Sequence, residues 1–369
     1  MDYNLEIQKL LLKKEEAYLP NDKINFIKQA IAIAAGHNDV QWSFDLRCEL
    51  IEEEACTTRY TETIPAFAWL LDAYDSDPDL FDIDYIISRY RWVINQMFRN
   101  VGVSVAQIQE IFVDYKLRLQ KHGYSLRSFY SAKADFGFFL DNMEIVQENI
   151  ELRDKYQANS FDYWINELYV NIEYVLRKNN TDYALQLEKE IAESDLEFVY
   201  YPFAVYTSLM RHFTRRKKYN EAHKYFLKAE NCLTRLENDQ STIPQIGCLI
   251  YFLSIKDKKK AWHFFEKYIN WTIDADDCTI TFFSIDILNL LREKQTKVLN
   301  VSPQLPWYRS DNTYNTTDLY NYYYNLAHDM VHRFDERNGN NIFSKRLEQY
   351  KDRCSNWFKS FLVRIFKRK

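Results

Sequence analysis

The sequence contains very little glycine and proline. Only six glycines and seven prolines occur in 369 residues, about 3.5% of the chain, whereas the two together make up about 12% of an average protein. Hairpin turns, bulges and barrel corners depend on these residues, so their scarcity argues against a β-rich fold of this size. The composition instead favours helices joined by short polar connections.

The glycines are also too widely spaced to build a phosphate-binding loop. The closest two, Gly123 and Gly137, are 14 residues apart, so the chain cannot contain a GxGxxG, Walker or GxSxG motif. This spacing argues against an enzyme driven by a nucleotide. No other cofactor is predicted from the sequence.

Sequence features typical of secreted, membrane-spanning or nucleic-acid-binding proteins are also missing. The six cysteines form no CxxC pair and predict reduced thiols in a cytoplasmic protein. The chain has no recognisable signal peptide and no apolar run of about 18 residues, so we expect no membrane span. The net charge of −5 offers no general attraction to phosphates, so we expect no nucleic acid partner.

The most informative feature present is a repeated pattern of small and aromatic residues. In the clearest example, Ala222 is followed by Phe226 and Ala229, a spacing that lets two helices cross closely while a ring fills the gap. Equivalent positions, 38 to 40 residues apart, are Ala66, Ala106, Val146, Ala184, Ala222 and Ala261. The period predicts about seven antiparallel helix pairs. We expect them at 3–18 with 22–36, 39–56 with 60–75, 82–100 with 104–122, 125–140 with 144–158, 161–178 with 181–194, 200–216 with 220–236, and 242–256 with 259–274.

The segment from Arg216 to Ala229 resembles the second half of a tetratricopeptide repeat (TPR). The likeness extends over roughly residues 20–275, although the Trp-Leu-Gly-Tyr pattern of the first helix is absent and Val146 replaces a small residue. The resemblance implies an all-α fold, a divergent TPR-like α-solenoid, that binds a protein or peptide. The run Phe334–Asn340 is also similar to a segment near the C-terminal end of some bacterial proteins of this kind.

The pattern divides the chain into three parts: a repeat array over 1–294, a connector over 295–314, and a C-terminal helical cap over 315–369. We expect helices near 279–293, 316–335 and 342–366, with Gly339 and Asn340 forming the turn between the last two. Apolar and basic residues alternate with helical spacing near the C-terminus, between Trp357 and Lys369. This tail can cap the array, or it can contact an anionic membrane surface or a partner.

The resemblance places the first helix of each pair on the concave face of a superhelix. Seven residues before the repeat markers stand Arg59, Arg99, Phe139, Arg177, Arg215 and Ser254, and one turn earlier stand Asn95, Asp135, Glu173 and Arg211. A polar, arginine-bearing column of this kind suits a peptide backbone or an acidic segment. The alternative is that Arg177 and Arg215 neutralise helix C-termini, or pair with Asp135 and Glu173 across repeats.

One pair of histidines indicates a candidate metal site. His328 and His332 are four residues apart and share one helix face, as two zinc ligands would. Asp329 occupies the place of a metalloprotease glutamate, and Asp335 is a candidate third ligand. The alternative is an amphipathic helix that carries two polar histidines.

A binding module accounts best for these features. We expect a cytoplasmic scaffold or regulator, without enzymatic activity, that binds a protein or peptide segment. Because the groove carries arginines, it would favour an acidic segment. A signalling-peptide receptor of the same fold is an alternative, although the N-terminal region has no helix-turn-helix signature. A metal-dependent hydrolase using His328 and His332 is the alternative from a different class.

Overall fold

The computed structural model describes residues 2–193, 199–236 and 238–350. The protein is all-α, as predicted: helices account for nearly all regular structure in these residues, and the only strands are β1 (Thr296–Val298) and β2 (Thr313–Asn315). Within the same residues, no helix is both long and apolar enough to cross a membrane. The predicted basic tail after residue 350 lies outside the described residues.

The chain forms two compact units. The first comprises Met1–Tyr201 with the short segments Cys232–Thr242 and Asp274–Asp276. The second comprises Pro202–Asn231, Ile243–Ile273 and the chain from Asp277 onward.

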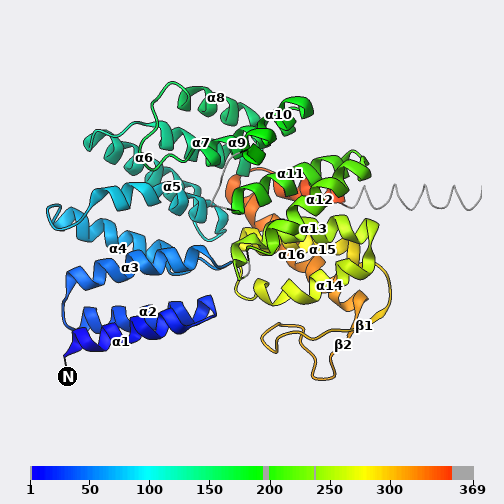
Figure 1. The fold of residues 1–369 in the computed structure, drawn as a ribbon, viewed down its shortest axis with the longest axis horizontal. Coiled ribbons are helices and arrows are strands. Elements are labelled where there is room, and N and C mark those ends of the chain that lie inside the picture. The colour runs from blue at the N-terminus through cyan, green and yellow to red at the C-terminus, as the bar shows by residue number, and fades with distance from the viewer. Residues whose placement is uncertain (1, 194–198, 237, 351–369) are drawn as a thin grey trace, which may run out of the picture. The chain divides into compact units, whose positions relative to one another are not determined.

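Ten α-helices lie in the described part of the first unit, and most of them pack on their neighbours in sequence (Figure 1). Their bounds are α1 Tyr3–Glu16, α2 Pro20–Gly36, α3 Val40–Ala55, α4 Thr63–Ser76, α5 Ile83–Arg99, α6 Val105–Lys121, α7 Arg127–Phe139, α8 Met143–Arg153, α9 Trp164–Arg177 and α10 Thr181–Glu193. Contacts join α1 to α2, α2 to α3, α3 to α4, α4 to α5, α7 to α8 and α9 to α10, while α5 packs on both α6 and α7.

The second unit is built around α13 and α15. Its helices are α11 Tyr200–Arg215, α12 Tyr219–Leu233, α13 Ile243–Lys256, α14 Lys258–Tyr268, α15 Asp277–Leu291 and α16 Thr316–Asn338, with the 3₁₀ turn η2 at Ile269–Thr272. A second 3₁₀ turn, η1 at Gln240–Thr242, belongs to the first unit. Helix α13 packs on α14 and α15, and α15 packs on α16.

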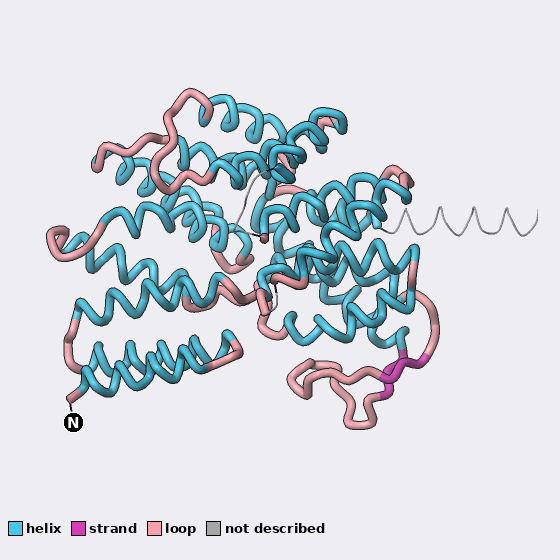
Figure 2. Tube along the Cα trace, viewed as in Figure 1, coloured by secondary structure: helices cyan, strands magenta, loops and turns pink. Residues whose placement is uncertain are grey.

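The predicted connector after α15 contains more order than a loop. Strands β1 and β2 pair in antiparallel fashion, with Lys297 opposite Tyr314, and the long loop between them returns to the start of α16 (Figure 2). Helix α16 ends at Asn338 and is capped by Gly339, which adopts the left-handed conformation with φ 64°. The following helix runs from residue 342 to the last described residue.

Three helix pairs share the same three-residue turn. Its middle residue is Asp141, Asn179 or Lys217, and each adopts a left-handed conformation, with φ of 51°, 63° and 60°. In each turn the next residue donates its N–H to the carbonyl five positions earlier, at distances of 2.9, 2.9 and 3.0 Å. In these three pairs the turn recurs at a spacing of 38 residues, within the predicted period of 38 to 40. The same turn also joins α2 to α3, where Asn38 has φ 55° and Asp39 donates its N–H to the Ala34 carbonyl at 3.0 Å. The geometry is therefore a common helix ending, and only its spacing reflects the period.

From α4 onward, the residue that marks the repeat is the fourth of the second helix in each pair. Ala66, Val146, Ala184, Ala222 and Ala261 all occupy this position and are at most 5% exposed. The predicted marker Ala106 is exposed, and the equivalent buried residue is Ile108. The prediction is wrong by two positions there because Ser104 and Gln107 form a capping box that starts α6 at Val105.

Helices α7 and α8 approach each other closely at Gly137. A methyl group added to this glycine would lie 2.9 Å from Cγ2 of Val146 and 3.1 Å from its backbone nitrogen. Glycine on α7 thus makes room for the larger Val146 on α8. In this pair the small residue has moved from the second helix to the first, which explains the departure at Val146.

A buried carboxylate holds the start of α4. Glu54, on α3, is fully buried and accepts hydrogen bonds from the backbone N–H groups of Glu62 and Thr63 and from the Thr63 hydroxyl. These N–H groups lie at the first turn of α4, where they have no partner within the helix. Burial raises the pKa of Glu54, against the opposing effect of these hydrogen bonds.

Candidate partner-binding face

Two of the predicted groove residues meet in the first unit. Asn95 on α5 donates its side-chain N–H to Oδ2 of Asp135 on α7, at 3.3 Å. Arg91, one turn before Asn95, binds the same carboxylate through two N–H groups, at 2.8 and 3.3 Å. Burial is the largest single influence on the pKa of Arg91 and acts to lower it, but the charge and hydrogen bonds of Asp135, together with Tyr201 and Tyr115, outweigh it, and the pKa is raised above its ordinary value.

A second ion pair joins α7 to α9. Arg127 donates from Nε to Oε1 of Glu167 at 2.7 Å and from Nη2 to Oε2 at 2.5 Å, and its third nitrogen donates to the carbonyl of Tyr156 at 2.7 Å. The two side chains are 19% and 11% exposed. Arg91, Asn95 and Asp135 thus form one polar cluster between α5 and α7, and Arg127 and Glu167 form a second between α7 and α9. We term these two clusters together the polar face.

The other predicted residues of this unit lie near the ends of their helices. Arg99 is the last residue of α5 and donates to Oδ2 of Asp276 at 3.0 Å. Arg177 is the last residue of α9; it donates to Asp141, in the turn of the preceding pair, and covers the Phe138 ring with 5.1 Å to the centroid.

Glu173 lies half-buried one turn before Arg177. No contact among the described residues joins it to the other predicted groove residues. The structure thus brings Asn95 and Asp135 together, whereas Arg99 and Arg177 have separate acidic partners of their own.

Arg211 and Arg215 belong to the second unit, where Arg215 is the exposed last residue of α11. Arg211 contacts the thiol of Cys248 on α13, and its Nη2 lies 3.9 Å from Oδ2 of Asp286 on α15. Burial raises the pKa of Cys248 to about 12, so the thiol stays protonated and unreactive at neutral pH.

His328 and His332 are brought together on α16, with 3.2 Å between their Nε2 atoms. Asp335, the candidate third ligand, is instead occupied, because its two oxygens accept the backbone N–H groups of Phe343 and Ser344 at 2.8 Å. Among the residues that the structure describes, no group of three His, Cys, Asp or Glu side chains could hold a metal ion. The hydrolase hypothesis thus gains no third ligand from this part of the chain.

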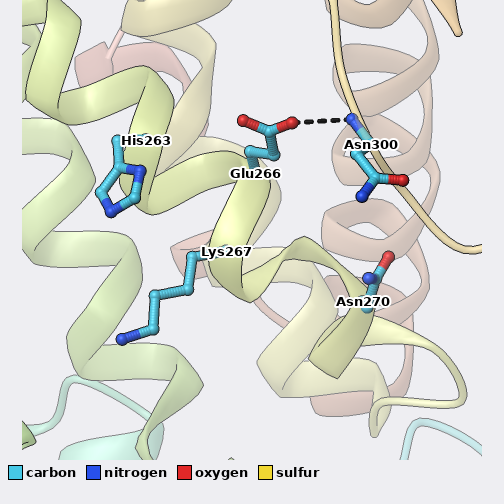
Figure 3. Close-up of a pocket in the computed structure, with 5 residues that line it drawn as sticks. All are labelled: His263, Glu266, Lys267, Asn270 and Asn300. Atoms are coloured by element: carbon cyan, nitrogen blue, oxygen red, sulfur yellow. Dashed lines mark hydrogen bonds between the residues drawn. The ribbon is translucent and has the colours of Figure 1, made fainter.

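A polar hollow of about 320 Å³ lies beside α14 in the second unit and was not predicted from the sequence. Figure 3 shows the residues that line it: His263, Glu266, Lys267, Asn270 and Asn300. Glu266 accepts the backbone N–H of Asn300 at 2.7 Å, and Asn270 accepts that of Ser302 at 2.9 Å. Two of the lining side chains therefore anchor the loop after β1. The helical spacing of the four α14 and η2 residues was the signal available in the sequence.

Comparison with known proteins adds no assignment to this geometry. No protein-family model matches the chain, and no curated protein matches it.

Proposed function

We propose that the protein is a TPR-like solenoid that holds a partner protein or peptide segment against the polar face of α5, α7 and α9. The observation that carries this proposal is the row of polar side chains on consecutive first helices, held in place by the contacts of Asp135 with Arg91 and Asn95. The equal spacing of 38 residues between the turns at Asp141, Asn179 and Lys217 supports the repeat architecture.

The polar face is better suited to forming hydrogen bonds with a peptide than to attracting an acidic partner by net positive charge. Each arginine there is already neutralised by a carboxylate, and the Arg91 and Asp135 side chains are 19% and 16% exposed. A guanidinium has five N–H donors, and Asp135 takes two of those on Arg91. The remaining donors can be offered to carbonyl or carboxylate oxygens of a bound segment.

An acidic partner would bind Arg177 by taking the place of its present partner, Asp141. Arg177 is exposed and paired with the exposed Asp141, and surface pairs of this kind contribute little to stability. A carboxylate on the partner can therefore replace Asp141 at low cost. Arg215, the exposed last residue of α11, is proposed as a separate contact for an acidic segment in the second unit.

We further propose that the protein works in the cytoplasm. The five cysteines among the described residues are free thiols, and reduced thiols are typical of a reducing compartment.

Site-specific photo-crosslinking in the native host tests the binding face. A photoreactive amino acid at Glu173, on the first helix α9, is expected to capture a partner that the same group at the exposed Val113, on the second helix α6, does not. Mass spectrometry would identify the captured protein. Asn95→Ala should reduce the Glu173 product while leaving the melting temperature within a few degrees of wild type.

The result at the control position, Val113, can contradict the proposal. Capture of the same protein at Val113 with equal yield would place the contact on the second helices and overturn the proposal. Capture at neither position from cells that express the protein at its native level would also count against it.

A further inference from the structure

Helix α16 carries a continuous row of aromatic rings on its accessible side. Tyr320, Tyr324, His328 and His332 follow at intervals of four residues, and consecutive ring centroids are 6.0, 6.0 and 4.4 Å apart. Both histidines are exposed. The row ends in two imidazoles whose Nε2 atoms approach to 3.2 Å.

We propose that His328 and His332 form a chelating site for a divalent transition-metal ion. Metal-to-imidazole bonds are about 2.0–2.1 Å long, so one ion bound to both Nε2 atoms at 3.2 Å would subtend an angle of about 100–105°. This angle lies between the roughly 90° of octahedral and roughly 109° of tetrahedral coordination. The imidazoles need little movement to share an ion.

The helix backbone fixes this arrangement from the opposite side. Ala327, Met330, Val331 and Phe334 are at most 4% exposed, and α16 packs on α15. The Tyr324 ring lies against His328, which restricts its rotation. Little conformational entropy is therefore lost when an ion binds, and this favours affinity.

The donor set selects the kind of ion. Imidazole nitrogen suits Zn²⁺, Ni²⁺ and Cu²⁺, whereas Mg²⁺ and Ca²⁺ prefer oxygen. Since the described residues supply only two ligands here, the remaining coordination positions stay open to water or to a side chain of a bound partner. The site is thus suited to reversible uptake of a metal ion and not to permanent structural metal.

Calorimetric titration of the full-length protein tests the site, with NiCl₂ and ZnCl₂ as probes and MgCl₂ as a negative control. One ion of Ni²⁺ or Zn²⁺ should bind per chain, and His328→Ala and His332→Ala should each weaken binding about tenfold or more, because each removes one of two ligands. His263→Ala is the matched control, since His263 is also exposed on a helix but has no second imidazole facing it among its described contacts.

Folding is checked by the melting temperature, which should be the same for all variants without metal because both histidines are exposed. Added Ni²⁺ should raise the melting temperature of wild type and His263→Ala but not of His328→Ala or His332→Ala, because an ion that binds only the folded state stabilises that state. If wild type takes up neither ion, or if His328→Ala and His332→Ala bind as tightly as wild type, the proposal is overturned. The close approach would then be a hydrogen bond between imidazoles only.

Discussion

The contact between α7 and α8 makes Gly137→Ala a sharp test of the repeat packing. Alanine is favoured over glycine inside a helix by about 1 kcal/mol, so propensity alone predicts a more stable protein. The added methyl, however, would lie 2.9 Å from Cγ2 of Val146 and 3.1 Å from its backbone nitrogen. Overpacking of this kind costs about 1–3 kcal/mol. We expect a net loss of up to about 2 kcal/mol.

Gly36→Ala provides the matched control. Gly36 is the last residue of α2, and nothing lies within 4 Å of the position that its methyl group would occupy. This substitution should stabilise the protein by up to about 1 kcal/mol. Urea unfolding followed by circular dichroism measures both variants, and we expect Gly137→Ala to be the less stable by about 1–3 kcal/mol.

A double variant identifies the contact responsible. Val146→Ala removes the nearest atom that the new side chain would meet, while Cγ2 of Ile145 at 3.0 Å and the Val146 backbone nitrogen at 3.1 Å remain. The loss in Gly137→Ala/Val146→Ala should therefore be partly relieved, and be smaller than the sum of the two single losses by about 0.5 kcal/mol or more. If Gly137→Ala stabilises the protein as much as Gly36→Ala does, and the two substitutions add independently, the close approach of α7 and α8 is refuted.

Three further outcomes follow from the ion pairs and the buried carboxylate. Arg177→Ala should change the free energy of unfolding by less than about 1 kcal/mol, because its pair with Asp141 is exposed; a larger loss in a urea titration would show that the pair is structural. Arg91→Ala should cost about 1.5–3 kcal/mol, because it leaves the partly buried Asp135 without its charged donor, and a loss equal to that of Arg177→Ala would contradict this. The pKa of Glu54 is raised in the folded protein, so the folded state holds this proton more tightly than the unfolded state does. The stability that Glu54 contributes is therefore fully present below its ordinary pKa of about 4.3, and it is lost as the pH rises through the folded pKa. Glu54→Gln should abolish this component when stability is measured from pH 4 to 7, and identical pH profiles for the two proteins would disprove the shift.

The helices could be predicted from the sequence because their ends carry local signals. Asn142 and Asp257 cap the starts of α8 and α14 with their side chains, and such residues are recognisable without a structure. The one error in the repeat register has the same origin. Ser104 and Gln107 form a readable capping box, and this box, not the small side chain of Ala106, fixes the start of α6.

The polar face could be predicted only in part because it depends on contacts between helices. The spacing of the repeat placed Asn95 and Asp135 in one register, and the structure joins them. Arg91 lies one turn earlier, and its choice of Asp135 as a partner depends on how α5 packs against α7. Similarly, Arg177 finds Asp141, a turn residue whose left-handed conformation no periodicity reveals.

The exchange of small and large residues between α7 and α8 bears on how the repeats could be duplicated. The turns at Asp141 and Asn179 have the same geometry, so a copy of one 38-residue segment would continue the backbone in phase. The side chains would fit less well, because Ala184 in place of Val146 would lose the close contact with Gly137. At the glycine's register α9 carries the larger Val175. The α7–α8 pair is therefore matched to its own two helices, and replacing α8 by α10 would keep the turn while loosening the packing at Gly137.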